Sequence, residues 1–262
     1  MIKAKKSLGQ NFLINKGVAG AILDIINPEK GDLILEIGPG RGALTAPLLK
    51  KEPRLALLLE KDRELARLHK GQPNCVVLNT DALAFPWAKL GALGVWKLLG
   101  NLPYNIASPL MWDVVSQCDG YSLAAFMVQK EVAQRATAAP GSKAYGALSV
   151  WLQSWSKPRL ELVAKPGSFR PSPKVDSAVL SFLPLPQERR CAHPRELKLL
   201  LDACFRQRRK QLGGVFSRGG LNEMRGALEL FSIPETARAE ELTPGQFNSL
   251  AACLAGIQRQ GK

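Results

Sequence analysis

The chain has 262 residues and a mass of 28.5 kDa, which is long for one compact core, so we expect a large domain and a smaller one. Apolar residues make up 46% of the sequence and charged residues 22%, and these ordinary proportions exclude a disordered, collagen-like or low-complexity chain. Lys and Arg outnumber Asp and Glu by 36 to 22, and the net charge of +14 predicts a polyanionic partner.

Apolar runs of strand length alternate with amphipathic helical stretches from about residue 16 to residue 183. The early runs are almost continuously apolar, as in parallel strands covered on both faces, so we expect an open α/β sheet. We predict strands over residues 33–37, 55–59, 75–78, 95–99, 123–128, 160–163 and 175–182. Only a short stretch rich in Pro separates the last two, so we expect an antiparallel pair at one edge of the sheet.

A linker follows the last predicted strand, over residues 184–190, where prolines and charged residues gather. Beyond it, apolar residues recur at helical spacing. We therefore expect a large α/β domain over residues 1–186 and a small helical domain over residues 187–262. The net charge is +9 in the first and +5 in the second, so both should face the polyanion.

The first chemical signal is a glycine-rich turn after the first predicted strand. Gly38, Gly40 and Gly42 let the backbone turn tightly and approach a ligand closely, which a Cβ atom would prevent. The stretch fits both the G-x-G-x-x-G/A loop of dinucleotide folds and the E/D-x-G-x-G-x-G loop of methyltransferases. Glu60, at the end of the second strand, suits the ribose of either cofactor, because a carboxylate accepts hydrogen bonds from two hydroxyls. The loop by itself leaves both classes open.

The discriminating signal follows the fourth strand, where the chain reads Asn101, Leu102, Pro103, Tyr104. Open α/β sheets bind ligands at this end of their strands. The side-chain oxygen of Asn101 and a neighbouring backbone carbonyl can accept hydrogen bonds from one exocyclic amine, while Tyr104 stacks on the ring that carries it. Two acceptors draw a delocalised adenine amine toward tetrahedral geometry and aim its lone pair at an electrophilic methyl group. The segment therefore predicts adenine methylation, rather than only a proline-broken loop before a helix.

With these residues, the sequence resembles the KsgA/RsmA-type ribosomal RNA adenine dimethyltransferases, relatives of the Erm methylases and the mitochondrial TFB factors. The resemblance covers nearly the whole chain and includes four further segments, at residues 5–13, 80–82, 169–177 and 204–210. It implies a Rossmann-like, S-adenosylmethionine-dependent methyltransferase domain over residues 1–186, with a basic N-terminal segment over residues 1–15. It also implies that the helical domain over residues 187–262 binds RNA.

The resemblance completes the set of expected site residues. The expected catalytic residues are Asn101, Leu102, Pro103, Tyr104 and Phe169. The expected cofactor-binding residues are Asn11, Leu13, Gly38, Gly40, Glu60, Asp81 and Asn101. The expected RNA-binding residues are Lys5, Lys6, Arg206, Arg208, Arg209 and Lys210. By resemblance, Phe169 stacks on the target base and Asp81 binds the adenine amine of the cofactor.

Plain structural alternatives exist for several of these residues. Asp81 suits the cap of a helix after the third strand. Phe169 suits the core of the edge hairpin, although the prolines that follow it favour an exposed loop. The basic start of the chain suits a solvated tail, and residues 206–210 suit a charged helix face. Four cations in five residues without an acid nevertheless favour phosphate contact.

The resemblance implies dimethylation of the N6 amines of two adjacent adenosines in the 3′-terminal hairpin of 16S rRNA, within the assembling small ribosomal subunit. A hairpin loop suits this reaction because the target base has to leave its stack. Two alternatives remain: an Erm-type methylase of 23S rRNA, and an assembly factor whose methylation is secondary. A nicotinamide-dependent dehydrogenase leaves both the Asn101–Tyr104 segment and the net charge unexplained.

No apolar run approaches the roughly 18 to 20 residues of a membrane span, and no apolar stretch follows the basic start. We therefore expect a cytoplasmic protein with no membrane partner, and a monomer. The five cysteines are scattered, with no C-x-x-C pair and only two histidines, His69 and His193. We expect no metal site and no disulfides, and we expect the cysteines to be small buried apolar residues.

Overall fold

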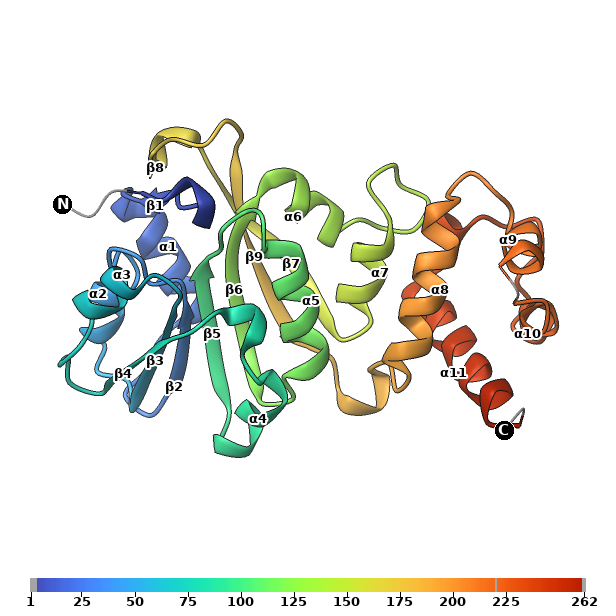
Figure 1. Cartoon of the computed structure of the whole chain (residues 1–262), viewed down its shortest axis with the longest axis horizontal. Coiled ribbons are helices and arrows are strands. Elements are labelled where there is room, and N and C mark those ends of the chain that lie inside the picture. The colour runs from blue at the N-terminus through green and yellow to red at the C-terminus, as the bar shows by residue number, and fades with distance from the viewer. Residues whose placement is uncertain (1–3, 220, 261–262) are drawn as a thin grey trace. The chain divides into compact units, whose positions relative to one another are not determined.

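The computed structural model describes residues 4–219 and 221–260 of the chain (Figure 1). The chain forms two compact units. The first contains the residues up to Ala133 and the segment Lys157–Pro184, and the second contains Gln134–Ser156 and the chain from Leu185 onward.

This division differs from the single boundary predicted after residue 186, because residues 134–156 belong to the helical unit. Within this segment, helix α7 (Ala147–Gln153) buries all its residues from 148 to 152 and contacts α8 (Pro194–Arg206) and α11 (Pro244–Gln260). A helix that is buried on several sides needs covering neighbours, and here the C-terminal helices provide them. The segment is therefore an insertion between two strands of the sheet.

The first unit is built on a seven-stranded sheet with the strand order β4-β3-β2-β5-β6-β9-β7 (Figure 1). The strands are β2 (Leu33–Ile37), β3 (Leu55–Glu60), β4 (Cys75–Asn79), β5 (Trp96–Asn101), β6 (Tyr121–Gln129), β7 (Ser156–Ala164) and β9 (Ser177–Pro184). The pairs from β4 to β6 are parallel, and β9 runs antiparallel to β6. The order reverses between β2 and β5, and the crevice at such a reversal is where open α/β sheets bind ligands.

A second, two-stranded antiparallel sheet joins β1 (Phe12–Leu13) to β8 (Phe169–Arg170). The sequence did not predict it, because each strand is only two residues long and the two lie far apart in the chain. This small sheet connects the N-terminal segment to the loop before β9.

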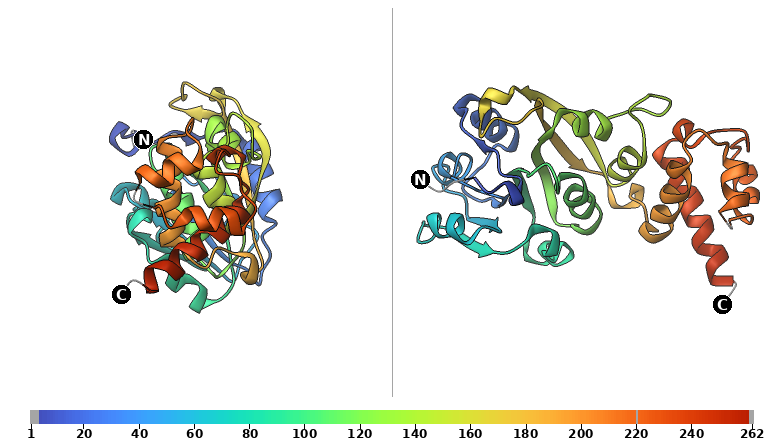
Figure 2. Two further views of the ribbon diagram at one scale, coloured as in Figure 1. Left: turned by 90° about the vertical axis from the view of Figure 1, so that its right-hand side faces the viewer. Right: turned by 45° about the horizontal axis from the view of Figure 1, so that its top comes forward.

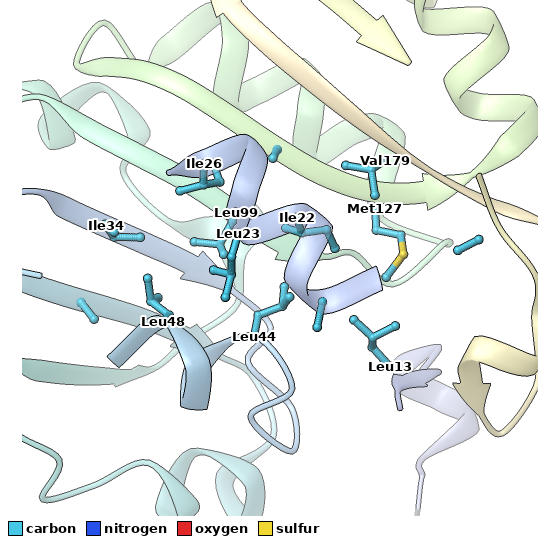
Figure 3. Close-up of a cluster of buried hydrophobic side chains, with 14 of the residues drawn as sticks. Leu13, Ile22, Leu23, Ile26, Ile34, Leu44, Leu48, Leu99, Met127 and Val179 are labelled. Carbon is cyan, nitrogen blue, oxygen red and sulfur yellow. The ribbon is translucent and has the colours of Figure 1, made fainter. Parts of the chain in front are cut away.

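Helix α1 (Lys16–Ile26) supplies much of the core of the first unit. Ile22 and Ile26 lie four positions apart, and so on one face of the helix, and both have no exposed surface. They form one cluster with Ile34 of β2 and Leu99 of β5 (Figure 3). The helix begins after Asn15, whose side chain accepts hydrogen bonds from two backbone N–H groups of the first turn.

The other helices of the first unit are no longer than α1. They are α2 (Thr45–Leu49), α3 (Arg63–Leu68), α4 (Trp87–Leu90) and α5 (Ala107–Gln117), with 3-10 turns η1 (Lys6–Leu8), η2 (Ala82–Ala84), η3 (Gly91–Leu93) and η4 (Pro166–Ser168). Helix α6 (Lys130–Ala136) then leads from β6 into the inserted segment.

The second unit is helical, as predicted for the C-terminal part of the chain. Besides α7, α8 and α11 it contains α9 (Leu212–Arg218), α10 (Met224–Leu230), and the turns η5 (Gln187–Arg189) and η6 (Ala239–Glu241). Helix α8 lies against α11 (Figure 2) and buries Leu197, Leu200, Leu201 and Cys204. It begins with Pro194, whose missing N–H costs nothing at a first helical position.

Within the described residues, no helix is long and apolar enough to cross a membrane, and no group of three or more His, Cys, Asp or Glu residues could hold a metal ion. Three of the cysteines, Cys118, Cys191 and Cys204, are buried, whereas Cys75 and Cys253 are partly exposed.

Candidate functional site

A pocket opens at the carboxyl ends of β2, β3 and β5, where the strand order reverses. Leu65 and five segments line it, the segments lying within residues 7–12, 37–40, 59–61, 80–82 and 101–106. The structure thus brings together the predicted residues Asn11, Gly38, Gly40, Glu60, Asp81, Asn101, Leu102, Pro103 and Tyr104. Since these come from five separate segments, the topology of the sheet and not local sequence assembles the site.

Three glycines shape the loop after β2, with φ values of 67° at Gly38, 54° at Gly40 and 84° at Gly42. A Cβ atom at Gly38 would meet nothing closer than the Asn101 carbonyl oxygen at 3.9 Å, so this glycine leaves space in the pocket open. A Cβ atom at Gly40 would lie 3.2 Å from the Phe12 ring, and one at Gly42 would lie 3.2 Å from the His69 ring. The second and third glycines therefore make room for side chains of the protein itself.

Glu60 is only 6% exposed, and backbone groups hold both of its oxygens. Oε2 accepts a hydrogen bond from the Gly40 N–H at 3.1 Å, and Oε1 accepts one from the Asp62 N–H at 2.8 Å. Burial raises the pKa of Glu60, and these two hydrogen bonds partly oppose that effect. Each carboxylate oxygen has a second lone pair, so Glu60 can still accept hydrogen bonds from a ligand.

Asp81 caps the η2 turn, which was the structural alternative for this residue. Its Oδ1 accepts a hydrogen bond from the Leu83 N–H at 3.0 Å, and its Oδ2 lies 2.7 Å from Lys61 Nζ. The Lys61 hydrogen bond is the largest cause that lowers the pKa of Asp81. Asp81 also lines the pocket, so its predicted cofactor contact remains compatible with the cap.

Asn101 is oriented by the N-terminal segment. Its Nδ2 donates a hydrogen bond to the backbone carbonyl of Asn11 at 2.8 Å. The nitrogen of the amide donates hydrogen bonds and the oxygen accepts them. Because this bond engages the nitrogen, Oδ1 is the atom left to accept a hydrogen bond from a ligand. Among the described residues, none donates a hydrogen bond to Oδ1.

The residues after Asn101 are held by hydrogen bonds to the neighbouring strands β6 and β9. The Leu102 N–H donates to the Met127 carbonyl at 3.0 Å, and the Tyr104 hydroxyl hydrogen-bonds to Ser177 Oγ at the start of β9. Burial is the largest cause that raises the pKa of Tyr104, so its hydroxyl stays protonated. The ring is therefore held at one edge of the pocket.

The N-terminal segment is attached to the rest of the site by charged contacts. Lys5 Nζ lies 2.9 Å from Asp62 Oδ2, and the Asp62 side chain has no exposed surface. The Arg41 guanidinium lies over the Phe12 ring, 4.4 Å from its centroid. An RNA contact of Lys5 would have to compete with its intramolecular partner. The side chain of Lys6 lies outside the described residues.

Two predicted site residues do not line the pocket. Leu13 and Phe169 face each other across the β1–β8 pair, are 5% and 3% exposed, and belong to the core cluster that contains Leu13 in Figure 3. The predicted exposure of Phe169 is wrong: the ring is buried, as in the core alternative, but in the β1–β8 pair and not in an edge hairpin. The reason is that Phe169 lies in a strand before the prolines, where pairing with β1 turns the ring inward. Base stacking by Phe169 stays a prediction that requires the ring to leave this cluster.

The basic cluster begins at Arg206, the last residue of α8, and continues in the turn after it instead of forming a helix face. Arg208 bonds Glu240 through Nε and the backbone carbonyls of Ser142 and Lys143 through its terminal nitrogen, at 3.2 and 2.9 Å. These partners engage its guanidinium inside the second unit, so the predicted phosphate contact of Arg208 would have to compete with them. Arg206, Arg209 and Lys210 are exposed, and their side chains have no ion pair within the described residues.

Three residues that shape the pocket were not predicted from the sequence: Lys61, Asp62 and His69. Asp62 carries a recognisable signal, because Asp before a helical stretch is a common N-cap, and its side chain does accept from the Glu64 N–H at 3.0 Å. His69 carries no local signal, since its partner, the Gly40 carbonyl, lies 29 residues away.

The chain is similar to known proteins over nearly its whole length. The profile of the family described as "Ribosomal RNA adenine dimethylase" matches residues 1–256 of the chain. A protein from Oleidesulfovibrio alaskensis, named Ribosomal RNA small subunit methyltransferase A, is 50% identical over 257 residues, which cover 96% of this chain and 91% of that protein.

Two solved structures are similar to the structure described above. A dimethyladenosine transferase from Plasmodium falciparum has a TM-score of 0.78 and 25% identity, covering 95% of this chain and 98% of that one. The 23S rRNA methyltransferase ErmE has a TM-score of 0.66 and 24% identity, covering 94% of this chain and 100% of that one, which is a likeness of fold. These likenesses confirm the predicted fold class, a methyltransferase α/β sheet followed by helices.

Behind the glycine loop, Glu36 is 1% exposed, and its Oε2 accepts a hydrogen bond from Thr45 Oγ1 at 2.8 Å. Burial raises the pKa of Glu36 to about 8, and the opposing effect of the Thr45 hydrogen bond is smaller. The folded chain therefore binds this proton more tightly than the unfolded chain does.

This difference predicts a pH dependence of stability. The contribution of Glu36 is favourable at low pH and is lost as the pH rises from about 4.5 to about 8. Glu36→Gln keeps the acceptor for Thr45 and removes the titration, so it should gain stability relative to the wild type across that range. Urea unfolding between about pH 5 and about pH 9 measures the difference, with the exposed Glu29→Gln as control. A difference independent of pH would contradict the assignment.

Proposed function

Because this chain belongs to the ribosomal RNA adenine dimethylase family, we propose that it methylates two adjacent adenosines in the 3′-terminal hairpin of 16S rRNA. The enzyme class follows from the family: it is an rRNA adenine dimethyltransferase. The choice of nucleotides, the assembling small subunit as the partner and the cytoplasm as the place of action belong to the proposal. The relative from O. alaskensis is named for the small subunit, which supports this choice of RNA.

The observation that carries the proposal is the orientation of Asn101. Its amide nitrogen is occupied by the Asn11 carbonyl, so the oxygen is the end left for a ligand. That oxygen and the Leu102 carbonyl would accept the two protons of an adenine N6 amine. As the methyl group transfers, the amine becomes tetrahedral and positive, and both acceptors bind it more strongly than in the ground state.

The pocket residues fit S-adenosylmethionine, which supplies an electrophilic methyl group when it is bound. The open space at Gly38, where a Cβ atom would project, leaves the backbone accessible to the ligand. Glu60 would accept hydrogen bonds from the ribose hydroxyls through its second lone pairs. Asp81 would accept one from the adenine amine of the cofactor, on the same side of the pocket as Lys61.

Tyr104 is the ring best placed for the target base. It lies three residues after Asn101, lines the pocket, and is fixed through its hydroxyl to Ser177. Stacking of an extruded base on an aromatic ring contributes roughly 1 to 3 kcal/mol, enough to offset part of the cost of unstacking. Pro103 adds no N–H between Asn101 and this ring, so acceptors predominate around the amine.

The rival activity on 23S rRNA has weaker support. The likeness to ErmE, at 24% identity, concerns the fold, whereas the small-subunit relative is 50% identical over nearly the whole chain. The two activities share a catalytic pocket, so only the RNA that is bound distinguishes them. An assembly role without methylation would leave the orientation of Asn101 without a purpose.

The cofactor prediction is that the purified protein binds S-adenosylmethionine or its demethylated product and does not bind NAD. Glu60→Ala removes a charged acceptor, so it should weaken this binding by roughly 1.5 to 3 kcal/mol. The exposed Glu29→Ala should leave it unchanged. Isothermal calorimetry measures both, and heat with NAD but none with S-adenosylmethionine would overturn the cofactor assignment.

The catalytic prediction separates turnover from affinity. Asn101→Ala should lower single-turnover methylation of small subunits by about 10² to 10³, the usual effect of removing one preorganised group, while subunit affinity stays nearly the same. Asn222→Ala, at an exposed position of the second unit, is the matched control. A near wild-type rate for Asn101→Ala at saturating cofactor would remove the central residue from the mechanism.

The RNA prediction concerns the three exposed cations at the end of α8 and in the turn after it. Neutralising Arg206, Arg209 and Lys210 should weaken subunit binding and lower the slope of log affinity against log salt by about 0.7 to 0.9 for each lost phosphate contact. Arg208→Gln should instead lower the unfolding temperature, because Glu240 and two carbonyls lose their donor. A salt titration that gives an unchanged slope for the triple variant would show that these cations face solvent.

A further inference from the structure

The backbone of Gly40 is held at both of its polar groups by buried side chains. Its N–H donates to Glu60 Oε2 at 3.1 Å, and its carbonyl lies 3.0 Å from His69 Nε2. Glu60 and His69 are each only 6% exposed. Backbone groups in such a place need partners, and here one comes from the end of β3 and the other from the end of α3.

The contact with the Gly40 carbonyl determines which ring nitrogen of His69 carries a hydrogen. A carbonyl oxygen can only accept, so Nε2 carries the proton in this hydrogen bond. The ring also packs against the loop: a Cβ atom at Gly42 would lie 3.2 Å from His69 Cε1. The third glycine of the motif is therefore required by this imidazole, and His69 touches the loop at two of its three glycines.

Helix α3 connects the two supports of the loop. At its start, the Asp62 N–H donates to Glu60 Oε1, and the Asp62 side chain accepts from the Glu64 N–H. At its end, His69 is the C-cap residue, with its own N–H bonded to the last turn of the helix. The six residues of α3 thus set the distance between Glu60, the carboxylate predicted to bind ribose, and His69, which binds the Gly40 carbonyl.

We propose that His69 is a positioning residue that holds the glycine loop in its cofactor-binding shape without contacting the cofactor. The inference rests on the proposed function, because it concerns the same pocket. His69 is not among the residues that line that pocket, and it meets the loop from behind. Glu60 has to share its oxygens between the loop and a ribose, whereas the bond from His69 is independent of the ligand. His69 therefore keeps Gly40 in place when Glu60 engages the ribose hydroxyls.

The test compares four variants of the full chain for binding of S-adenosylhomocysteine by calorimetry and for thermal unfolding. His69→Leu removes the donor and should weaken binding about 3- to 10-fold, the range for one lost hydrogen bond. His69→Gln carries an N–H at a similar reach and should restore binding to within about twofold. His69→Asn carries the same amide one bond shorter and should fail to restore it. His193→Leu, the other histidine of the chain, should leave binding unchanged.

Kinetic measurements distinguish a positioning role from a general loss of stability. With small subunits as substrate, His69→Leu should raise the KM for S-adenosylmethionine by the same factor and leave kcat near the wild-type value, because the loop binds the donor and not the base. If His69→Leu fails to fold, the comparison of Gln with Asn at position 69 decides the question by itself.

Four results would overturn the inference. Equal affinities for His69→Gln and His69→Asn would show that the hydrogen bond to Gly40 does not matter. A fall in kcat without a change in KM would place the effect elsewhere than the loop. A wild-type protein that binds NAD and no S-adenosylhomocysteine would remove the proposed function and this inference together, whereas tight wild-type binding that His69→Leu leaves unchanged would remove only the inference.

Discussion

The hydrogen bond between the Asn101 amide and the Asn11 carbonyl is the contact on which the pocket depends most. It joins the N-terminal segment to the end of β5, and it fixes which end of the amide remains for a ligand. Phe12, the next residue, packs against Gly40, so the same segment also covers the glycine loop. An amide with free rotation would present a donor as readily as an acceptor, and a donor would repel the amine that the enzyme has to hold.

The site keeps two carboxylates in low-dielectric surroundings. Glu36 and Glu60 are both buried, and the charge of Glu60 adds to the effect of burial that raises the pKa of Glu36. Glu60 is stabilised by two backbone N–H groups, whereas Glu36 has one hydroxyl partner and a pKa of about 8. Glu60 is thus the carboxylate whose charged form the backbone stabilises more, and it is the one that we propose to bind the ribose. Sites of this kind are commonly less stable than the fold allows, because function requires polar groups inside.

Patterns within short stretches made most of the fold predictable. The strands from β2 to β6 are continuous apolar runs, and the loop at Gly38 and the segment from Asn101 to Tyr104 occur directly after strand ends, so local sequence was enough. The features that the sequence did not predict all depend on contacts between distant residues. Phe169 is buried because β8 pairs with β1, Arg208 is engaged because Glu240 and the turn at Ser142 lie beside it, and His69 meets a carbonyl 29 residues earlier. No sequence pattern around these residues predicts such partners.

Mapping the methylated nucleotides by mass spectrometry tests the central claim most directly. Purified protein would be incubated with labelled S-adenosylmethionine and, in separate reactions, immature small subunits or large-subunit RNA. The account predicts N6,N6-dimethyladenosine at two adjacent positions in the 3′-terminal hairpin of 16S rRNA and no label in 23S rRNA. Label in 23S rRNA alone, or a methyl group on a base atom other than adenine N6, would contradict it.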